Sequence, residues 1–352
     1  MLYDSILWID DINRVMATIP ELKELEGNTV FITGASGLIG SAVIDLLLRY
    51  NELHDSSIKI FVAGRSYSKM HSRFGERMKN MTFVEYDASK HNDFYFKADY
   101  IIHAASNASP DTYTKEPVET MSSNFLGMKE LLDYANNVKS KRILYVSSSE
   151  VYGKKDTEGA FLENQYGYVD VLNSRSSYPI GKRAAETLCI SYSDEFRGGV
   201  EVVIVRPGHI YGPTALRRDK RIASAWAFDV ACGRDIVMKS DGKQIRSYCY
   251  CLDCASAIIK VLMCGEKNNA YNISNPDSVI SIAELAEILT DVGKCKLIRS
   301  APSDEEKKSF NPMNNSSLNS EKLLSLGWHG LFNARTGIEH TVRIIRDSED
   351  IR

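Results

Sequence analysis

A glycine-rich segment near the N-terminus constrains the fold of this chain more than any other feature. Residues 30–33 are strand-forming, Gly34, Gly37 and Gly40 follow, and an apolar pattern with helical spacing extends over 38–47. A strand that turns sharply into a helix needs a first residue without a Cβ. The second glycine lets the backbone approach a pyrophosphate, and the third lets helix and strand pack closely. The helix N-terminus favours negative charge, so the segment predicts a dinucleotide site.

Strand-like and helical segments alternate after this turn as far as residue 205. The strand-like runs lie at 58–63, 82–86, 100–103, 143–146 and 202–205. Helical patterns occupy 117–138 and 178–197. Near-continuous apolar runs are typical of parallel strands that are covered on both faces. The predicted fold class is therefore α/β, a Rossmann-type doubly wound parallel sheet, with a smaller mixed α/β domain at the C-terminal end.

Composition excludes several classes of function. The chain has 352 residues, 25% of them charged, and a net charge of -3, which argues against a nucleic-acid or anionic-membrane surface. No apolar run reaches the ~18 residues of a membrane span, and we expect no signal peptide. Seven cysteines suit reduced thiols, so we expect a cytoplasmic protein. Cys249, Cys251 and Cys254 lack further ligands at metal spacing, which favours buried packing over a metal site.

The end of the second predicted strand bears on the choice of cofactor. In the NAD form of this motif, an acidic residue at that point accepts a hydrogen bond from the adenosine ribose. This chain has Gly64 and Arg65 instead. A guanidinium can bind the 2′-phosphate of NADP, and it can also stack on adenine or lie in solvent. NAD and NADP therefore both remain candidates. Small residues after the fourth strand, Ala104, Ala105 and Ser106, would let either cofactor lie close to the sheet.

A serine cluster and a Tyr-x-x-x-Lys pair indicate acid–base chemistry. The serines at 147–149 follow the buried strand 143–146, and Tyr178 and Lys182 share one helix face because they are four residues apart. A phenol has an unperturbed pKa of about 10 and is a poor base. We expect a nearby ammonium to favour the phenolate and a serine hydroxyl to bridge phenol and substrate.

Together these motifs resemble the extended short-chain dehydrogenase/reductases of the nucleotide-sugar epimerase/dehydratase family, over about residues 28–345. Segments 105–110, 148–153 and 178–189 look most similar to UDP-glucuronate decarboxylases. The resemblance implies enzymes that oxidise C4 of a nucleotide-linked sugar to a 4-keto group. It also implies tightly held NAD or NADP, a nucleotide-diphosphate sugar as substrate, and a homodimer.

The resemblance implies a role for particular residues. Ser148 would relay the proton, Tyr178 would act as the base at the C4 hydroxyl, and Lys182 would bind the nicotinamide ribose. Glu150 would be an acid/base facing the sugar. The implied cofactor contacts are Gly34, Ser36, Gly37, Leu38, Ile39, Gly40, Arg65, Asp87 (at the adenine amine), Ala88, Ala104, Ala105, Ser106, Tyr178, Lys182 and Pro207. The implied substrate contacts are Ser109, Glu150, His209, Arg221 and Arg246, of which Arg246 is favoured for the diphosphate.

Three departures from the family pattern leave the reaction open. His209 stands where the family has Asn, Thr214 where decarboxylases have Arg, and Ser149 where 4,6-dehydratases have the Asp that expels water. We place decarboxylation first, epimerisation at C4 next and 4,6-dehydration after it. A cofactor-sensing binding protein without catalysis is the non-enzyme alternative, and the presence of both Tyr178 and Lys182 counts against it.

The predicted organisation has three regions. Residues 1–27 form a helical extension, which docks on the body or meets a partner subunit. Residues 28–205 with 237–264 form the dinucleotide-binding domain, and residues 206–236 with 265–352 form the nucleotide-sugar-binding domain. For the homodimer, the helix at 117–138 carries more apolar residues than one sheet face would cover. These residues are Met121, Phe125, Leu131 and Leu132.

Overall fold

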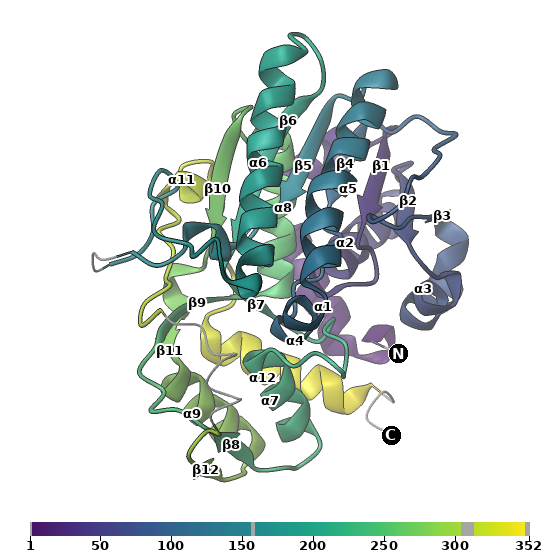
Figure 1. Ribbon diagram of the computed structural model, residues 1–352. Helices are drawn as coiled ribbons and strands as arrows, with labels where there is room; N and C mark the ends of the chain where they lie inside the picture. The colour runs from purple at the N-terminus through teal and green to yellow at the C-terminus, as the bar shows by residue number, and fades with distance from the viewer. Residues whose placement is uncertain (1, 156–158, 304–312, 349–352) are drawn as a thin grey trace.

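The computed structural model describes residues 2–155, 159–303 and 313–348. Its larger part is a seven-stranded sheet in the order β10-β6-β5-β4-β1-β2-β3, in which every pairing is parallel (Figure 1). The strands are β1 (Thr29–Thr33), β2 (Lys59–Gly64), β3 (Thr82–Glu85), β4 (Tyr100–His103), β5 (Arg142–Val146), β6 (Glu201–Pro207) and β10 (Asn269–Ile273). The order 3-2-1-4-5-6 is that of the Rossmann fold, so the predicted fold class is confirmed.

Helices cover both faces of this sheet. They are α2 (Leu38–His54), α3 (Tyr67–Phe74), α4 (Pro110–Lys115), α5 (Pro117–Asn137), α6 (Ser177–Glu195) and α8 (Cys251–Cys264). Successive strand residues point to opposite faces, which builds two cores. Phe31 and Ile143 pack with α5 and α6, whereas Val30 and Leu144 pack with α2 and α8. The carboxyl ends of β1, β2 and β4 meet at one edge, because Thr33 is opposite Ala63 on one side and His103 on the other.

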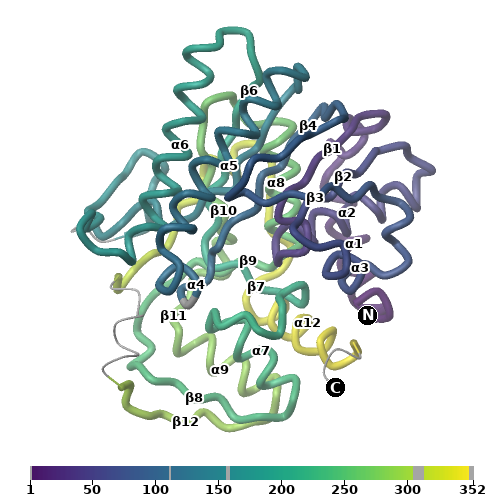
Figure 2. The backbone as a smooth tube through the Cα atoms, turned by 45° about the vertical axis from the view of Figure 1, so that its right-hand side comes forward, coloured from purple at the N-terminus to yellow at the C-terminus, as the bar shows by residue number. Residues whose placement is uncertain are grey.

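The smaller part of the molecule contains two small sheets. One has three strands in the order β11-β9-β7, and the other pairs β12 with β8. Its elements are β7 (His209–Tyr211), α7 (Ile222–Ala231), β8 (Ile236–Met238), β9 (Ile245–Tyr250), β11 (Val279–Ser281), α9 (Ile282–Gly293), β12 (Leu297–Arg299), α11 (Glu321–Leu324) and α12 (Ala334–Asp347). Figure 2 shows α7, α9, β8 and β12 at the end of the molecule away from β6. The 3₁₀ helices of the chain are η1 (Leu2–Asp4), η2 (Pro20–Leu25), η3 (Gly75–Asn80), η4 (Ser149–Tyr152), η5 (Ser174–Ser176) and η6 (Pro276–Ser278).

Two strands lie outside the regions to which the sequence assigned them. β10 was grouped with the smaller domain, yet it pairs with β6 and completes the large sheet. β9 was grouped with the dinucleotide-binding domain, yet it pairs with β7 and β11. The chain crosses between the two parts more often than a pattern of apolar residues reveals, because strand partners are chosen by tertiary packing. Cys249 ends up buried in β9, and Cys251 and Cys254 are buried in α8.

The N-terminal extension docks on the body. Helix α1 (Ile6–Met16) packs against α2, α8 and α12. Its buried Asp11 accepts a hydrogen bond from Tyr250 Oη at 3.0 Å and lies 2.9 Å from Nδ1 of His340 on α12. The Trp8 indole donates to Asp45 on α2. The extension therefore joins elements of the larger part to elements of the smaller part.

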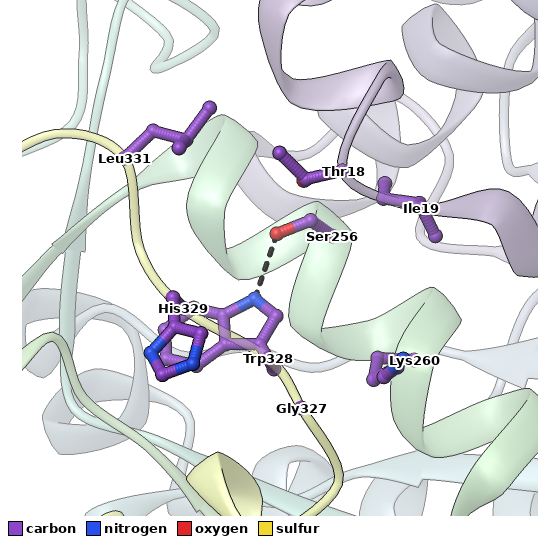
Figure 3. Close-up of a pocket in the computed structure, with 8 residues that line it drawn as sticks. All are labelled: Thr18, Ile19, Ser256, Lys260, Gly327, Trp328, His329 and Leu331. Carbon is purple, nitrogen blue, oxygen red and sulfur yellow. Dashed lines mark hydrogen bonds between the residues drawn. The ribbon is translucent and has the colours of Figure 1, made fainter.

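A small cavity of about 110 Å³ lies where this extension meets α8 and the segment before α12 (Figure 3). Thr18 and Ile19 line one side and Trp328 lines the other. The Trp328 indole donates to Ser256 Oγ at 2.8 Å, and Lys260 forms an ion pair with Glu21. Because these polar groups already bind one another, we interpret the cavity as a packing gap, and its lining includes none of the predicted site residues.

Helix α5, which the sequence analysis proposed for dimerisation, exposes only some of the apolar residues counted there. Leu131 and Leu132 are fully buried in the protein's own core, so counting them as surplus apolar residues was wrong. Met121 and Phe125 are exposed by 42% and 36%. Leu131 and Leu132 belong to the core cluster that also contains Phe31 and Ile143 of the sheet. In the described ranges, no helix is long and apolar enough to cross a bilayer.

Candidate active site

The glycine turn between β1 and α2 forms a cradle that side chains would fill. Gly34 has a φ of +69°, and a Cβ there would lie 2.6 Å from the Ala104 carbonyl carbon. A Cβ on Gly40 would collide with the Gly34 carbonyl oxygen. Gly37 is the N-cap residue of α2. Beside it, Ser36 and Ile39 are partly exposed and Leu38 is buried. The bare backbone and the open helix N-terminus fit a dinucleotide pyrophosphate.

A pocket of about 370 Å³ lies at the carboxyl ends of β2 and β3. Arg65, Glu85 and Asp87 line it together with the segment Lys90–Asp93. Burial raises the pKa of Asp87, but hydrogen bonds from Ser89 and the charges of Lys90 and Arg65 outweigh it, so the pKa lies below its ordinary value. Arg65 itself is exposed. The pocket thus holds carboxylates as well as the guanidinium that the sequence pointed to.

The remaining predicted cofactor residues lie along the same sheet edge. Ala104, Ala105 and Ser106 follow β4 and are partly exposed, and the Ser106 hydroxyl donates to Asn124 at 2.9 Å. Pro207 ends β6. Ala88 faces α5 instead, since a Cβ on Gly127 would meet the Ala88 Cβ at 2.8 Å.

The serine–tyrosine–lysine group comes together at the amino end of α6. The Tyr178 hydroxyl is hydrogen-bonded to Ser148, which precedes η4. The Lys182 ammonium donates to the Val146 carbonyl at 2.8 Å and lies 5.9 Å from the centroid of the Tyr178 ring. The side chains of both Tyr178 and Lys182 are buried. The predicted grouping therefore exists, with Lys182 anchored to the end of β5.

The protonation of this group differs from what the spacing predicted. Burial lowers the pKa of Lys182 to about 7. Burial also raises the pKa of Tyr178 to about 12, although the hydrogen bond with Ser148 and the charge of Arg221 act to lower it. Lys182 is not among the groups that shift the pKa of Tyr178, and desolvation outweighs the charge of Arg221. Tyr178 is held as a phenol.

Glu150 contacts one of two residues that the sequence analysis missed, Arg175 and Tyr113. Its Oε2 atom lies 3.6 Å from Nη1 of Arg175, and each of the two side chains is 22% exposed. The other guanidinium nitrogen of Arg175 donates to the Tyr113 hydroxyl at 3.4 Å. The Tyr113 ring stacks on Tyr178, with centroids 5.1 Å apart and planes 13° from parallel. A phenol, a carboxylate and a guanidinium therefore surround the tyrosine that was proposed as the base.

The spacing of these two residues could have drawn attention to them. Arg175 stands three residues before Tyr178, so a helical turn brings it back to the same side of the chain. Tyr113 follows shortly after the segment 105–110. Nothing in the sequence indicates that α4 folds back over α6, and the stacking is therefore visible only in the structure.

The predicted substrate residues of the smaller part converge on the same region. Arg246 is buried on β9, where its two terminal nitrogens donate to the carbonyls of Ile245 and Met313. Arg221 precedes α7 and forms an ion pair with Asp219. His209, on β7, feels the charges of both arginines. Arg221 also acts on Tyr178, and Glu150 acts on Arg246, so charges from both parts of the molecule face one another.

Two further predicted positions can be placed. Ser109 is the N-cap residue of α4, and its side chain makes no capping hydrogen bond. Thr214, which replaces an arginine of decarboxylases, is buried and donates to the Leu38 carbonyl at 2.8 Å. Position 214 therefore supports the start of α2 and supplies no positive charge.

A Rossmann sheet, a glycine cradle and a buried Ser-Tyr-Lys group define a nicotinamide-dependent short-chain dehydrogenase/reductase fold. A model of the NAD dependent epimerase/dehydratase family matches residues 30–274, more than half of the chain. The chain belongs to this family of enzymes. It is similar to UDP-glucuronic acid decarboxylase 6 of Arabidopsis thaliana, with 30% identity over 79% of this chain and 79% of the relative. It is also similar to UDP-glucuronic acid decarboxylase 1 of Xenopus tropicalis, with 28% identity over 92% of this chain and 74% of the relative.

Solved structures support the fold. The UDP-glucose 4-epimerase of Thermotoga maritima with UDP-glucose superimposes with a TM-score of 0.75 at 19% identity, covering 90% of this chain and 98% of that one. The UDP-glucuronic acid 4-epimerase of Bacillus cereus, in complex with UDP-glucuronic acid and NAD, gives a TM-score of 0.72 at 19% identity, covering 90% and 99%. At such identities the likeness concerns the fold alone.

Proposed function

We propose that this enzyme binds a nucleotide-diphosphate sugar and NAD or NADP, oxidises C4 of the sugar, and then removes the carboxylate of a hexuronate. The observation that carries the proposal is the contact between Glu150 and Arg175 beside the Tyr178–Ser148 hydrogen bond. The similarity to UDP-glucuronic acid decarboxylases supports the same reaction. A guanidinium next to the acid–base group gives a carboxylated sugar a partner of opposite charge.

The first step moves a proton and a hydride away from C4. The proton of the C4 hydroxyl would pass to the ionised oxygen of Tyr178, either directly or through Ser148, which would give its own proton to Tyr178 as it takes up that of the substrate. A bound oxidised nicotinamide supplies the hydride acceptor and a positive charge. With a pKa of about 12, Tyr178 needs such a positive charge nearby to act as a base. Lys182, whose pKa burial lowers to about 7, lies one helical turn away and can exchange protons near neutrality.

The second step follows from the 4-keto group. In a 4-keto-hexuronate the carboxylate is β to the ketone, so its C–C bond breaks with the electron pair delocalised onto the keto oxygen as CO₂ leaves. Arg175 would hold the carboxylate, and Glu150 would deliver a proton to the ring carbon that loses CO₂. Return of the hydride to C4 then makes the reaction redox-neutral. The residues that bind the cofactor are those of the glycine cradle and the pocket at Arg65.

A 4-epimerase is the second candidate. The buried hydroxyl of Thr214 leaves this chain without the arginine that decarboxylases carry there, and this observation favours a reaction that needs no carboxylate loss. An epimerase would return the hydride to the opposite face of C4. Dehydration is disfavoured because Ser149 cannot act as the acid that expels water.

The test is product analysis with purified enzyme. UDP-, dTDP-, GDP- and CDP-linked hexoses and hexuronates would be incubated with it, and the products would be separated by liquid chromatography and identified by mass spectrometry. Decarboxylation predicts a nucleotide pentose and CO₂ from a nucleotide hexuronate. An epimerised hexuronate of unchanged mass would favour the second candidate, and absence of change with all these sugars would contradict both.

We further propose a homodimer formed through α5 and α6. The two helices pack side by side on one face of the sheet (Figure 1). Helix α5 carries exposed apolar side chains. These are Val118, Met121, Phe125 and Leu126.

A further inference from the structure

His209 occupies an unusual position in the candidate active site. It is the first residue of β7, and its ring lies 5.7 Å from that of Tyr248 on β9. Its Nδ1 atom is buried and has no hydrogen-bond partner in the part of the chain that the structure describes. A buried polar atom without a partner is costly, and at a binding site it indicates a group that a ligand satisfies.

Two guanidinium groups act on this imidazole, and one of them, that of Arg221, is paired with Asp219. Burial is the largest cause that lowers the pKa of His209, and the charges of Arg246 on β9 and Arg221 before α7 lower it further, to about 3. Tyr248, the other titratable group facing it from β9, is neutral because burial raises its pKa. Helices α2 and α8 also pack on β7, and no carboxylate from them is among the charges acting on His209 in the described ranges. The site therefore offers two guanidinium groups and one neutral imidazole.

We propose that His209 is a proton-linked ligand for the diphosphate of the substrate: the imidazole takes up one proton from solvent as the anion enters between it, Arg221 and Arg246. This inference rests on the proposed function, since it takes a nucleotide-diphosphate sugar as the ligand. An asparagine at this position, as in the family pattern, would donate a hydrogen bond without changing charge. The histidine therefore makes substrate affinity depend on pH in a way that Asn does not.

The physical reason is a reversal of the local potential. In the free protein, two positive charges and burial oppose a third positive charge. A diphosphate carries two negative charges, which neutralise the arginines and stabilise an imidazolium at Nδ1. The pKa of His209 is then low in the free protein and raised in the complex. Between those two values, binding takes up a proton, and affinity falls by up to about tenfold for each pH unit of increase.

The experiment is calorimetric titration of the full-length protein with UDP-glucose, whose diphosphate has no titration of its own between about pH 6 and 8. Titrations at pH 7 in two buffers of different ionisation enthalpy count the protons taken up. We expect net proton uptake for the wild type and for the control His329→Asn, whose imidazole is exposed at the small cavity. We expect His209→Asn to bind UDP-glucose with little or no proton uptake and with a flat pH dependence.

The outcomes separate this inference from the proposed function. Equal proton uptake by wild type and His209→Asn would overturn the inference and assign the linkage to another group, such as Lys182, whose pKa burial lowers to about 7. No proton uptake by the wild type would also overturn it. A wild type that binds UDP-glucose with proton uptake but gives no product with any hexuronate would contradict the decarboxylase proposal and leave the role of His209 supported.

Discussion

Replacing Arg175 with glutamine should weaken the binding of a carboxylated nucleotide sugar and spare that of a neutral one. Arg175 lies 3.6 Å from Glu150 and also contacts Tyr113. Neither partner contributes a second positive charge, so the guanidinium is the group that a hexuronate carboxylate would meet. Glutamine keeps a hydrogen-bond donor at this position and removes the charge.

The expected size of the effect follows from the type of contact. A hydrogen bond to a charged group contributes about 1.5–3 kcal/mol, and each 1.4 kcal/mol corresponds to about a tenfold change in affinity. Loss of Arg175 should therefore raise the Kd of UDP-glucuronate about 10- to 140-fold. Its ion pair with Glu150 is partly exposed, which limits the cost in protein stability to about 1 kcal/mol or less. The Kd of UDP-glucuronate for Arg175→Lys should lie between those for the wild type and Arg175→Gln, because an ammonium keeps the charge but lacks the planar geometry of a guanidinium.

The assay is calorimetric binding of UDP-glucuronate and of UDP-glucose to each variant. Arg234→Gln is the matched control, since Arg234 is an exposed arginine paired with Asp229 on α7. We expect the Kd of UDP-glucose to change less than about twofold in Arg175→Gln, well within the effect of one weak surface contact. Equal weakening of both ligands would refute the reasoning, because it would mean that Arg175 only holds Glu150 and the chain around it.

Tyr178→Phe and Lys182→Ala should each abolish C4 oxidation of the true substrate, while circular dichroism shows an intact fold. Near wild-type turnover of Tyr178→Phe would contradict the assignment of Tyr178 as the base. Both NAD and NADP should bind. In calorimetric titration, Arg65→Ala should weaken the binding of NADP more than that of NAD, because only NADP has a 2′-phosphate. Equal losses of affinity for the two cofactors would show that Arg65 only stacks on adenine or lies in solvent. Light scattering should give the mass of a dimer at micromolar concentration, and Phe125→Glu with Met121→Glu should shift it to the monomer; a monomeric wild type would remove the dimer proposal.

Local features of the sequence were sufficient to predict the large sheet. Gly34 adopts a φ that other residues rarely take, and this requirement is written in the residue itself. The apolar runs at β5 and β6 are buried on both faces, as their composition demanded. The Tyr178–Lys182 spacing is likewise a local helical property, and the structure retains it in α6.

The sequence did not reveal which groups would contact these residues. The pKa of Tyr178 depends on how deeply α6 is covered, and burial is a property of the whole fold. Tyr113 and Arg175 come from α4 and η5, which meet only because α4 folds over the start of α6. The position of β10 at the edge of the large sheet was also missed, since a short strand carries no mark of its partner.

For this protein, the sequence alone therefore determined the elements whose signals are local: the glycine turn, the buried strands and the Tyr-x-x-x-Lys helix. Only the tertiary structure decided what surrounds them. The ion pair of Glu150 with Arg175, the unpartnered Nδ1 of His209 and the phenol form of Tyr178 all arise from segments far apart in the chain. Charge and desolvation act through space, so their effect is set by packing between elements and not by the order of residues.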